Sequence, residues 1–155
     1  MSIPPLYGLI LAGGSSTRMQ RDKAALLYRG RTQLDRAYEL AKKYHLKTAF
    51  GTDILFSPEL AKRQGTLLVS LTKWYTPAEA LGMATGTNGE LLALSGERSP
   101  YRGKLGVVEE GALADLLLVD GDPIANIKLV ADPAKNFVVI MKDGKIYKNT
   151  LGQHP

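Results

Sequence analysis

The sequence has 155 residues, a formal net charge of +5 at pH 7 and no cysteine. This is the length of one ordinary domain, and 45% hydrophobic with 23% charged residues is typical of a soluble globular protein. No apolar run approaches the ~20 residues that span a bilayer, and the lack of cysteine excludes disulfides and thiolate metal sites. No basic leader precedes the apolar N-terminal stretch, as a signal peptide requires. We therefore expect a cytoplasmic protein with no membrane partner.

The positive charge is concentrated in the first third of the chain. Residues 1–47 hold nine Lys and Arg against three Asp and Glu, whereas residues 48–155 hold eleven against twelve. A basic segment favours a phosphate-bearing partner, although a solvated helix face with spare lysines produces the same pattern. The change near residue 47 indicates two parts.

The N-terminal elements begin with a short apolar run at residues 7–12, which predicts a buried parallel strand. Gly13 and Gly14 follow as a turn, and the next three residues are good helix caps. A second turn is expected at Arg29 and Gly30. Thr32 then caps a predicted helix over 32–44, with one apolar stripe made of Leu34, Ala37, Tyr38, Ala41 and Tyr44.

The middle of the chain is predicted to return to extended structure over 47–56 and then to become helical. A helix is expected from a Ser57 cap to about Trp74. Thr76 caps the next one, with Pro at its first position and Glu79 three residues after the cap. A third short helix is predicted over 88–94.

Beyond Gly103 the periodicity changes to short Val, Ile and Leu runs separated by turns, which predicts antiparallel strands. The stretch IKLVAD, residues 127–132, is one of these runs. Asp143 and Gly144 lie between two further runs and are a strong hairpin signal.

The stretch GLILAGGSSTRMQRDK, residues 8–23, has the layout of a phosphate-binding loop. A strand that enters a glycine turn and a helix start gathers unpaired backbone N–H groups around one point, where an anion is favoured. Gly13 and Gly14 allow close approach of a ligand, and Arg18 and Lys23 can neutralise phosphate oxygens. The stretch follows neither the Walker pattern nor the dinucleotide fingerprint.

A longer stretch, LILAGGSSTRMQRDKAALLYRGRTQLDRA, resembles the start of the nucleotidyltransferase family that includes molybdenum-cofactor guanylyltransferase. The matching residues are Leu11, Ala12, Gly13, Gly14, Ser16, Arg18, Met19, Asp22, Lys23 and Ala24, whereas Gln20 replaces the family's glycine. The resemblance implies that the backbone at residues 11–14 holds a nucleotide and that Arg18 and Lys23 contact its phosphates. It also implies Mg²⁺ with the nucleotide, held by a downstream carboxylate for which no match is found, since the motif match ends near residue 40.

Asp53 follows Gly51 and Thr52 at the end of the predicted strand, where α/β barrels place their chemistry. A single carboxylate at a strand end also commonly caps the next helix. From about Tyr38 to Thr150, however, the chain resembles the C-terminal part of a metal-dependent amidohydrolase of the imidazolonepropionase and prolidase-like type. The pieces that carry this resemblance are AFGTD, YTPAEALGMATGTNGELLAL, GKLGVVEEGALADLLLVDGDP and VVIMKDGKIYKN.

The second resemblance implies that Asp53 is a metal ligand and the catalytic carboxylate of a centre that holds zinc or another divalent metal. That family also needs histidines, and this sequence has only His45 and His154. His45 lies near a helix end, where a solvated or capping role is expected, and His154 lies in the tail. The site is therefore expected to be incomplete.

Together the two resemblances imply a chimera of α/β class. The expected fold is a partial α/β layer, in which a nucleotidyltransferase-like first strand and helix join a fragment of an amidohydrolase barrel, with the strands of a small sandwich at the C-terminus. Strand 7–12 could lie parallel to a strand at 48–52, with helix 32–44 as the crossover. The expected segments are 1–40, 41–102 and 103–150, with a tail at 151–155.

Three functions remain open from the sequence. The chain is an amidohydrolase-family polypeptide, truncated and inactive alone, that acts by lineage on C–N bonds of a small-molecule substrate. Alternatively, it is a module that binds GTP or CTP, or a non-catalytic fragment whose exposed apolar surface is covered by forming a homo-oligomer. No specific nucleic acid is expected as a partner.

Overall fold

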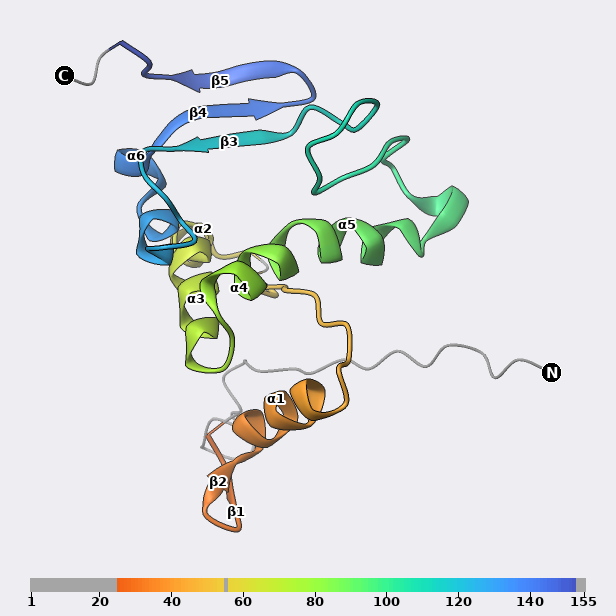
Figure 1. Cartoon of the computed structure of the whole chain (residues 1–155), viewed down its shortest axis with the longest axis vertical. Coiled ribbons are helices and arrows are strands. Elements are labelled where there is room, and N and C mark those ends of the chain that lie inside the picture. The colour runs from red at the N-terminus through yellow and green to blue at the C-terminus, as the bar shows by residue number, and fades with distance from the viewer. Residues whose placement is uncertain (1–24, 55, 153–155) are drawn as a thin grey trace. The chain divides into compact units, whose positions relative to one another are not determined.

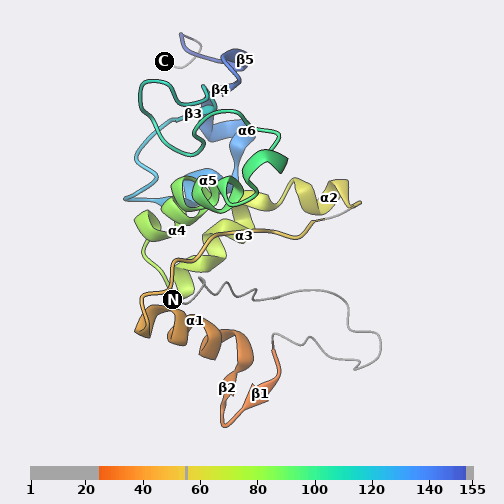
Figure 2. The same cartoon turned by 90° about the vertical axis from the view of Figure 1, so that its right-hand side faces the viewer.

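The computed structural model describes residues 25–54 and 56–152 (Figures 1 and 2). The chain divides into two compact units, Met1–Leu46 and Lys47–Pro155. No helix in the described residues is both long and apolar enough to cross a membrane.

The described part of the first unit is a small hairpin followed by one helix. Strands β1 (Leu27–Tyr28) and β2 (Arg31–Thr32) pair antiparallel around a turn in which Arg29 and Gly30 have φ of 51° and 79°. Two consecutive positive φ values are the signature of the tight turn that suits the twist of a hairpin. The turn predicted at these two residues is therefore confirmed.

Helix α1 (Gln33–Lys43) begins where Thr32 was expected to cap it, because the Thr32 hydroxyl accepts the Asp35 N–H at 3.0 Å. Of the predicted apolar stripe, Ala41 is buried but Tyr44 is 62% exposed. His45 follows the helix with φ 49°, and its N–H donates to the Lys42 carbonyl. The expectation that His45 lies at a helix end is confirmed.

The second unit begins with short helices rather than the single helix expected over 57–74. The elements are α2 (Pro58–Ala61), α3 (Gln64–Ser70) and the 3₁₀ turn η1 (Leu71–Lys73). A Cβ on Gly65 would lie 1.9 Å from the Val130 carbonyl oxygen, so the backbones of α3 and the 127–131 segment are in direct contact. This contact sets the direction of α3, and the chain turns between α2 and α3 to meet it.

The two following helices agree with the sequence prediction. Helix α4 (Pro77–Ala84) starts with a complete capping box between Thr76 and Glu79. Helix α5 (Gly86–Ala93) begins two residues earlier than expected, and a short 3₁₀ turn, η2 (Gly96–Arg98), follows it.

The C-terminal residues form a three-stranded antiparallel sheet in the order β3 (Leu116–Val119), β4 (Phe137–Lys142) and β5 (Lys145–Asn149). The hairpin predicted at Asp143 and Gly144 is confirmed, with φ of 50° and 72° at these residues. The Asp115 carboxylate accepts the Asp143 N–H at 2.7 Å and thereby ties the turn to the segment before β3. The sheet lies above the helices of this unit in Figure 1.

Two expected strands are corrected by the structure. Residues 127–132 form the 3₁₀ turn η3 (Ile127–Ala131), followed by helix α6 (Pro133–Asn136). Ile127 and Val130 are both buried, because side chains three residues apart share one face of a 3₁₀ turn. Residues 48–52 are irregular instead of forming a strand, because the hydrogen bonds of Phe50 go to α4 and α5 rather than to a neighbouring strand.

The described core of the second unit lies where α3, η1, α4, η3 and β4 meet. Its buried side chains are Leu68, Leu71, Ala80, Met83, Ile127, Val130, Phe137 and Val138. The chain is thus of α/β class, with several helices and two small antiparallel sheets. Within residues 25–54 and 56–152 no strands close into a barrel.

Candidate functional site

The predicted nucleotide-binding residues Leu11, Ala12, Gly13, Gly14, Arg18 and Lys23 lie outside the described residues. The same holds for His154. Their roles therefore remain predictions from the sequence. Asp53 and His45 are described, and they belong to different units.

Asp53 lies on an exposed, irregular segment at the start of the second unit. The segment is anchored three residues earlier, where the Asn88 side chain of α5 bonds both the N–H and the carbonyl of Phe50. Lys47 forms an ion pair with Glu90 on the same helix. Asp53 itself has φ 49°, a left-handed backbone that Asp tolerates better than most residues. The backbone conformation by itself therefore favours Asp at position 53.

The predicted zinc site has a poor fit to the residues that the structure describes. Catalytic zinc takes three protein ligands as a rule. No group of three or more His, Asp or Glu side chains gathers anywhere in the described chain, and so none gathers around Asp53.

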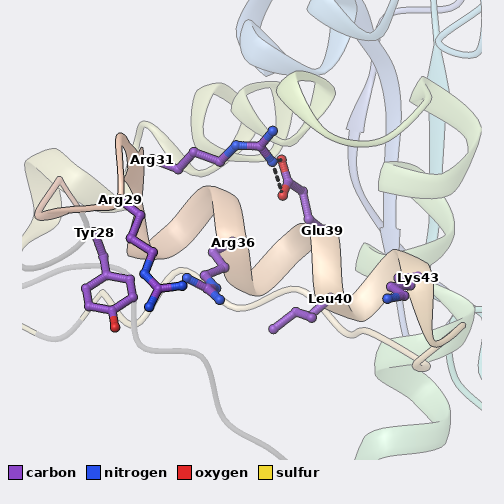
Figure 3. Close-up of a pocket in the computed structure, with 7 residues that line it drawn as sticks. All are labelled: Tyr28, Arg29, Arg31, Arg36, Glu39, Leu40 and Lys43. Carbon is purple, nitrogen blue, oxygen red and sulfur yellow. Dashed lines mark hydrogen bonds and ion pairs between the residues drawn. The ribbon is translucent and has the colours of Figure 1, made fainter.

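The first unit contains a hollow along α1. The hollow, of about 340 Å³, is lined by residues of the β1–β2 hairpin and of one face of the helix (Figure 3). The lining residues are Tyr28, Arg29, Arg31, Arg36, Glu39, Leu40 and Lys43. The helix contributes positions 36, 39, 40 and 43, which share one side because they are three or four residues apart.

The hollow has an excess of positive charge. Arg31 is neutralised by Glu39, an exposed ion pair of 2.5 Å. The guanidinium carbons of Arg29 and Arg36 lie 5.6 and 5.4 Å from the centroid of the Tyr28 ring, distances that permit cation–π attraction. Figure 3 draws both groups beside that ring. Among the described residues no carboxylate lies within ion-pair distance of Arg29, Arg36 or Lys43.

Sequence reasoning detected the charge of this region but did not identify the hollow. The excess of Lys and Arg in residues 1–47 was the available signal. Spacing along α1 groups Arg36 with Lys43, but only the folded hairpin brings Tyr28 and Arg29 to the same side.

The architecture defines an α/β protein with a basic N-terminal unit and a helical second unit capped by a small sheet. The sequence profile of the MobA-like NTP transferase domain matches residues 8–96, more than half of the chain. The chain therefore belongs to the MobA-like NTP transferase domain family.

A curated relative supports this family. Over 86 residues the chain is 35% identical to the molybdenum cofactor biosynthesis bifunctional protein of Synechocystis sp. (strain ATCC 27184 / PCC 6803 / Kazusa). The matched region is 56% of this chain but 23% of that protein. The chain thus spans about a quarter of the length of this relative.

The solved structures that resemble this chain come from another group. An amidohydrolase matches with a TM-score of 0.63 and 30% identity, covering 75% of this chain and 26% of that one. A prolidase complexed with N-methylphosphonate-L-proline matches with a TM-score of 0.61 and 28% identity, covering 74% and 26%. The A. niger ochratoxinase matches with a TM-score of 0.60 and 27% identity, and the match covers 74% of this chain and 24% of that one.

The chain therefore combines a MobA-like part with an amidohydrolase-like fold, as the two sequence resemblances implied. The family match ends at residue 96, well beyond the motif match near residue 40. Since one match covers over half of the chain and the other three quarters, the two similarities overlap. The fold is a partial amidohydrolase-like α/β fold.

Proposed function

We propose that this chain binds a nucleoside triphosphate, GTP or CTP, through residues 11–23. The observation that carries this proposal is the family match, which begins at residue 8 and includes the whole glycine loop. In this proposal the backbone N–H groups at Leu11, Ala12, Gly13 and Gly14 contact the nucleotide. Unpaired N–H groups at the start of a helix favour an anion such as a phosphate. The charge of the first unit supports this assignment.

Arg18 and Lys23 contact the phosphates in this proposal. Both side chains carry a full positive charge at pH 7, and Arg in particular can bond a phosphate through two N–H groups. Mg²⁺ bound with the nucleotide would neutralise further phosphate charge, and such a site needs as few as one or two carboxylates.

In this proposal the similarity to amidohydrolases concerns the fold of the second unit and not its activity. The second unit retains that architecture as a scaffold, and the chain does not by itself hydrolyse C–N bonds of a small molecule. Asp53 provides one carboxylate, whereas a hydrolytic zinc centre needs several ligands in one place. With His45 and His154 as its only histidines, this sequence supplies too few for such a centre.

Self-association is a further part of the proposal, because apolar side chains remain exposed on the sheet. Leu117 and Leu118 of β3 are 57% and 48% exposed, and Tyr147 of β5 is 64% exposed. Consecutive strand residues point to opposite faces, so apolar side chains are exposed on both faces of the sheet, where a second copy of this chain would cover them. Light scattering of the pure protein tests this, and a concentration-independent monomer mass would contradict it.

Calorimetry with GTP and CTP, each with and without Mg²⁺, tests nucleotide binding. We expect saturable binding of one of them, with at least a tenfold loss in the Arg18→Ala, Lys23→Ala double variant. Lys62→Ala is the control, because Lys62 is an exposed lysine in the second unit. No binding at millimolar nucleotide, or an equal loss in the control, would overturn the assignment.

A zinc titration tests the second unit separately. We expect no tight stoichiometric zinc binding by the chain and no difference between the wild type and Asp53→Ala. Tight binding of one or two zinc ions would overturn the scaffold interpretation without affecting nucleotide binding.

A further inference from the structure

Three cations line the hollow along α1, and none of them has a carboxylate partner among the described residues. Two of them lie beside the Tyr28 ring. Arg29 comes from the hairpin turn and Arg36 from the second turn of the helix, yet both guanidinium groups approach Tyr28. Lys43 lies two helical turns further along the same face. Like charges that line one hollow repel one another, and an anion bound between them would replace this repulsion with attraction.

The backbone at Arg29 adds an independent observation. Its φ of 51° is a conformation that Asn, Asp and Gly adopt easily, and Asn followed by Gly is the preferred pair for such a turn. An Arg at this position is strained relative to Asn. Residues kept in unfavourable backbone conformations are found most often at functional sites. The strain at Arg29 therefore indicates a role for its side chain beyond the turn.

We propose that this hollow binds a short chain of linked phosphate groups, such as a diphosphate, at a site made of residues different from those of the glycine loop. A single phosphate carries about −1.5 to −2 charges at pH 7, whereas the hollow offers three cations that no described carboxylate neutralises, so two linked phosphates match its charge better than one. Its volume of about 340 Å³ lies within the range of small-molecule pockets.

The charge balance assigns a role to each lining residue. Arg29 and Arg36 bond the phosphate oxygens in the planar, two-pronged manner of guanidinium groups. Lys43 supplies a point charge at the far end of the hollow. Glu39 is the only carboxylate among the described lining residues, and it opposes binding both by repulsion and by occupying Arg31.

Calorimetric titration of the full chain with inorganic pyrophosphate at low ionic strength tests the proposal. We expect saturable binding, weaker binding of orthophosphate, and a decline with added salt because the groups are exposed. Arg36→Gln and Lys43→Gln each weaken pyrophosphate binding about three- to fivefold, the range that exposed ion pairs produce. Lys62→Gln, an exposed lysine of the second unit, leaves it unchanged.

Two further variants separate loss of binding from loss of folding. Arg29→Asn raises the midpoint of thermal unfolding, because Asn relieves the backbone strain in the turn, and it still weakens pyrophosphate binding. Glu39→Gln tightens pyrophosphate binding about two- to fivefold, a gain that structural damage would not produce. Unchanged or weaker binding in Glu39→Gln would overturn the proposal.

The Arg18→Ala, Lys23→Ala double variant distinguishes this site from the loop. It retains pyrophosphate binding if the hollow is the site, even if nucleotide binding is lost. Loss of pyrophosphate binding in this variant, with full retention in Arg36→Gln and Lys43→Gln, would assign the anion to the loop and overturn the proposal. Tighter binding of a single-stranded oligonucleotide than of pyrophosphate would also overturn it.

Discussion

Asn88 satisfies both backbone polar groups of Phe50: its Nδ2 donates to the Phe50 carbonyl at 2.8 Å, and its Oδ1 accepts the Phe50 N–H at 3.1 Å. A side-chain amide thus takes the place of a neighbouring strand. The Phe50 N–H also donates to the Met83 carbonyl at the end of α4, with 3.3 Å between nitrogen and oxygen. These contacts hold the segment that carries Asp53 against the helices of the second unit.

Asn88→Ala is expected to lower the free energy of unfolding of the second unit by about 1–3 kcal/mol, because it leaves the part-buried Phe50 carbonyl without the amide that bonds it. Urea denaturation followed by fluorescence of Trp74, the single tryptophan, measures this. Glu90→Ala is the matched control, since it removes an exposed ion pair between the same two segments and costs less than about 1 kcal/mol. Equal costs for the two variants would contradict the role given to Asn88.

Gly65→Ala is expected to destabilise the protein by about 1–3 kcal/mol, although alanine is the better helix former. The reason is the contact with η3, because the new Cβ would lie 1.9 Å from the Val130 carbonyl oxygen. Gly82→Ala is the control on α4, where a Cβ meets nothing within 4 Å and a gain of up to about 1 kcal/mol is expected. Thermal unfolding of both variants checks this, and stabilisation by Gly65→Ala would contradict the packing described.

Thr76→Ala is expected to cost about 0.5–2 kcal/mol through loss of the α4 cap. The Thr76 hydroxyl accepts the Glu79 N–H at 3.3 Å, while the Glu79 carboxylate accepts the Thr76 N–H at 2.7 Å. Thr76→Ser keeps the hydroxyl and should retain most of the stability. Circular dichroism during urea unfolding measures both variants, and a Thr76→Ser loss as large as that of Thr76→Ala would exclude the cap as the cause.

Asp53→Asn is expected to leave stability unchanged, whereas Asp53→Ala costs about 1 kcal/mol, because Asn tolerates the left-handed backbone and Ala does not. Denaturation with and without added zinc measures both effects. If zinc stabilises the wild type and Asp53→Asn abolishes this effect, then metal binding by the carboxylate, rather than the backbone conformation, explains why Asp occupies position 53.

Local signals predicted the caps and turns correctly. The Thr32 cap, the Thr76 and Glu79 capping box, and the turn at Asp143 and Gly144 are each completed within four residues. Sequence spacing is sufficient in such cases, because the interacting groups are neighbours along the chain.

Contacts between residues far apart in the sequence determined the structure of the two segments that were wrongly predicted as strands. The segment around Phe50 has the composition of a strand, yet its hydrogen bonds go to Asn88, thirty-eight positions away. Likewise, the IKLVAD run has strand-like residues, but Ile127 and Val130 turn together into a core that includes α3. Hydrophobic pattern alone cannot distinguish a short buried strand from a short buried turn of helix.

The sequence by itself determined that the chain is α/β, that it has a basic N-terminal third, and that it joins a glycine-loop start to an amidohydrolase-like body. The first two properties follow from composition and from runs of adjacent residues, and the third follows from the two family resemblances. Only the tertiary structure decided that Arg29, Arg36 and Lys43 line one hollow beside Tyr28, and that the described residues gather no metal ligands around Asp53. A binding site depends on distances between side chains, and within each unit those distances are set only when its elements fold together.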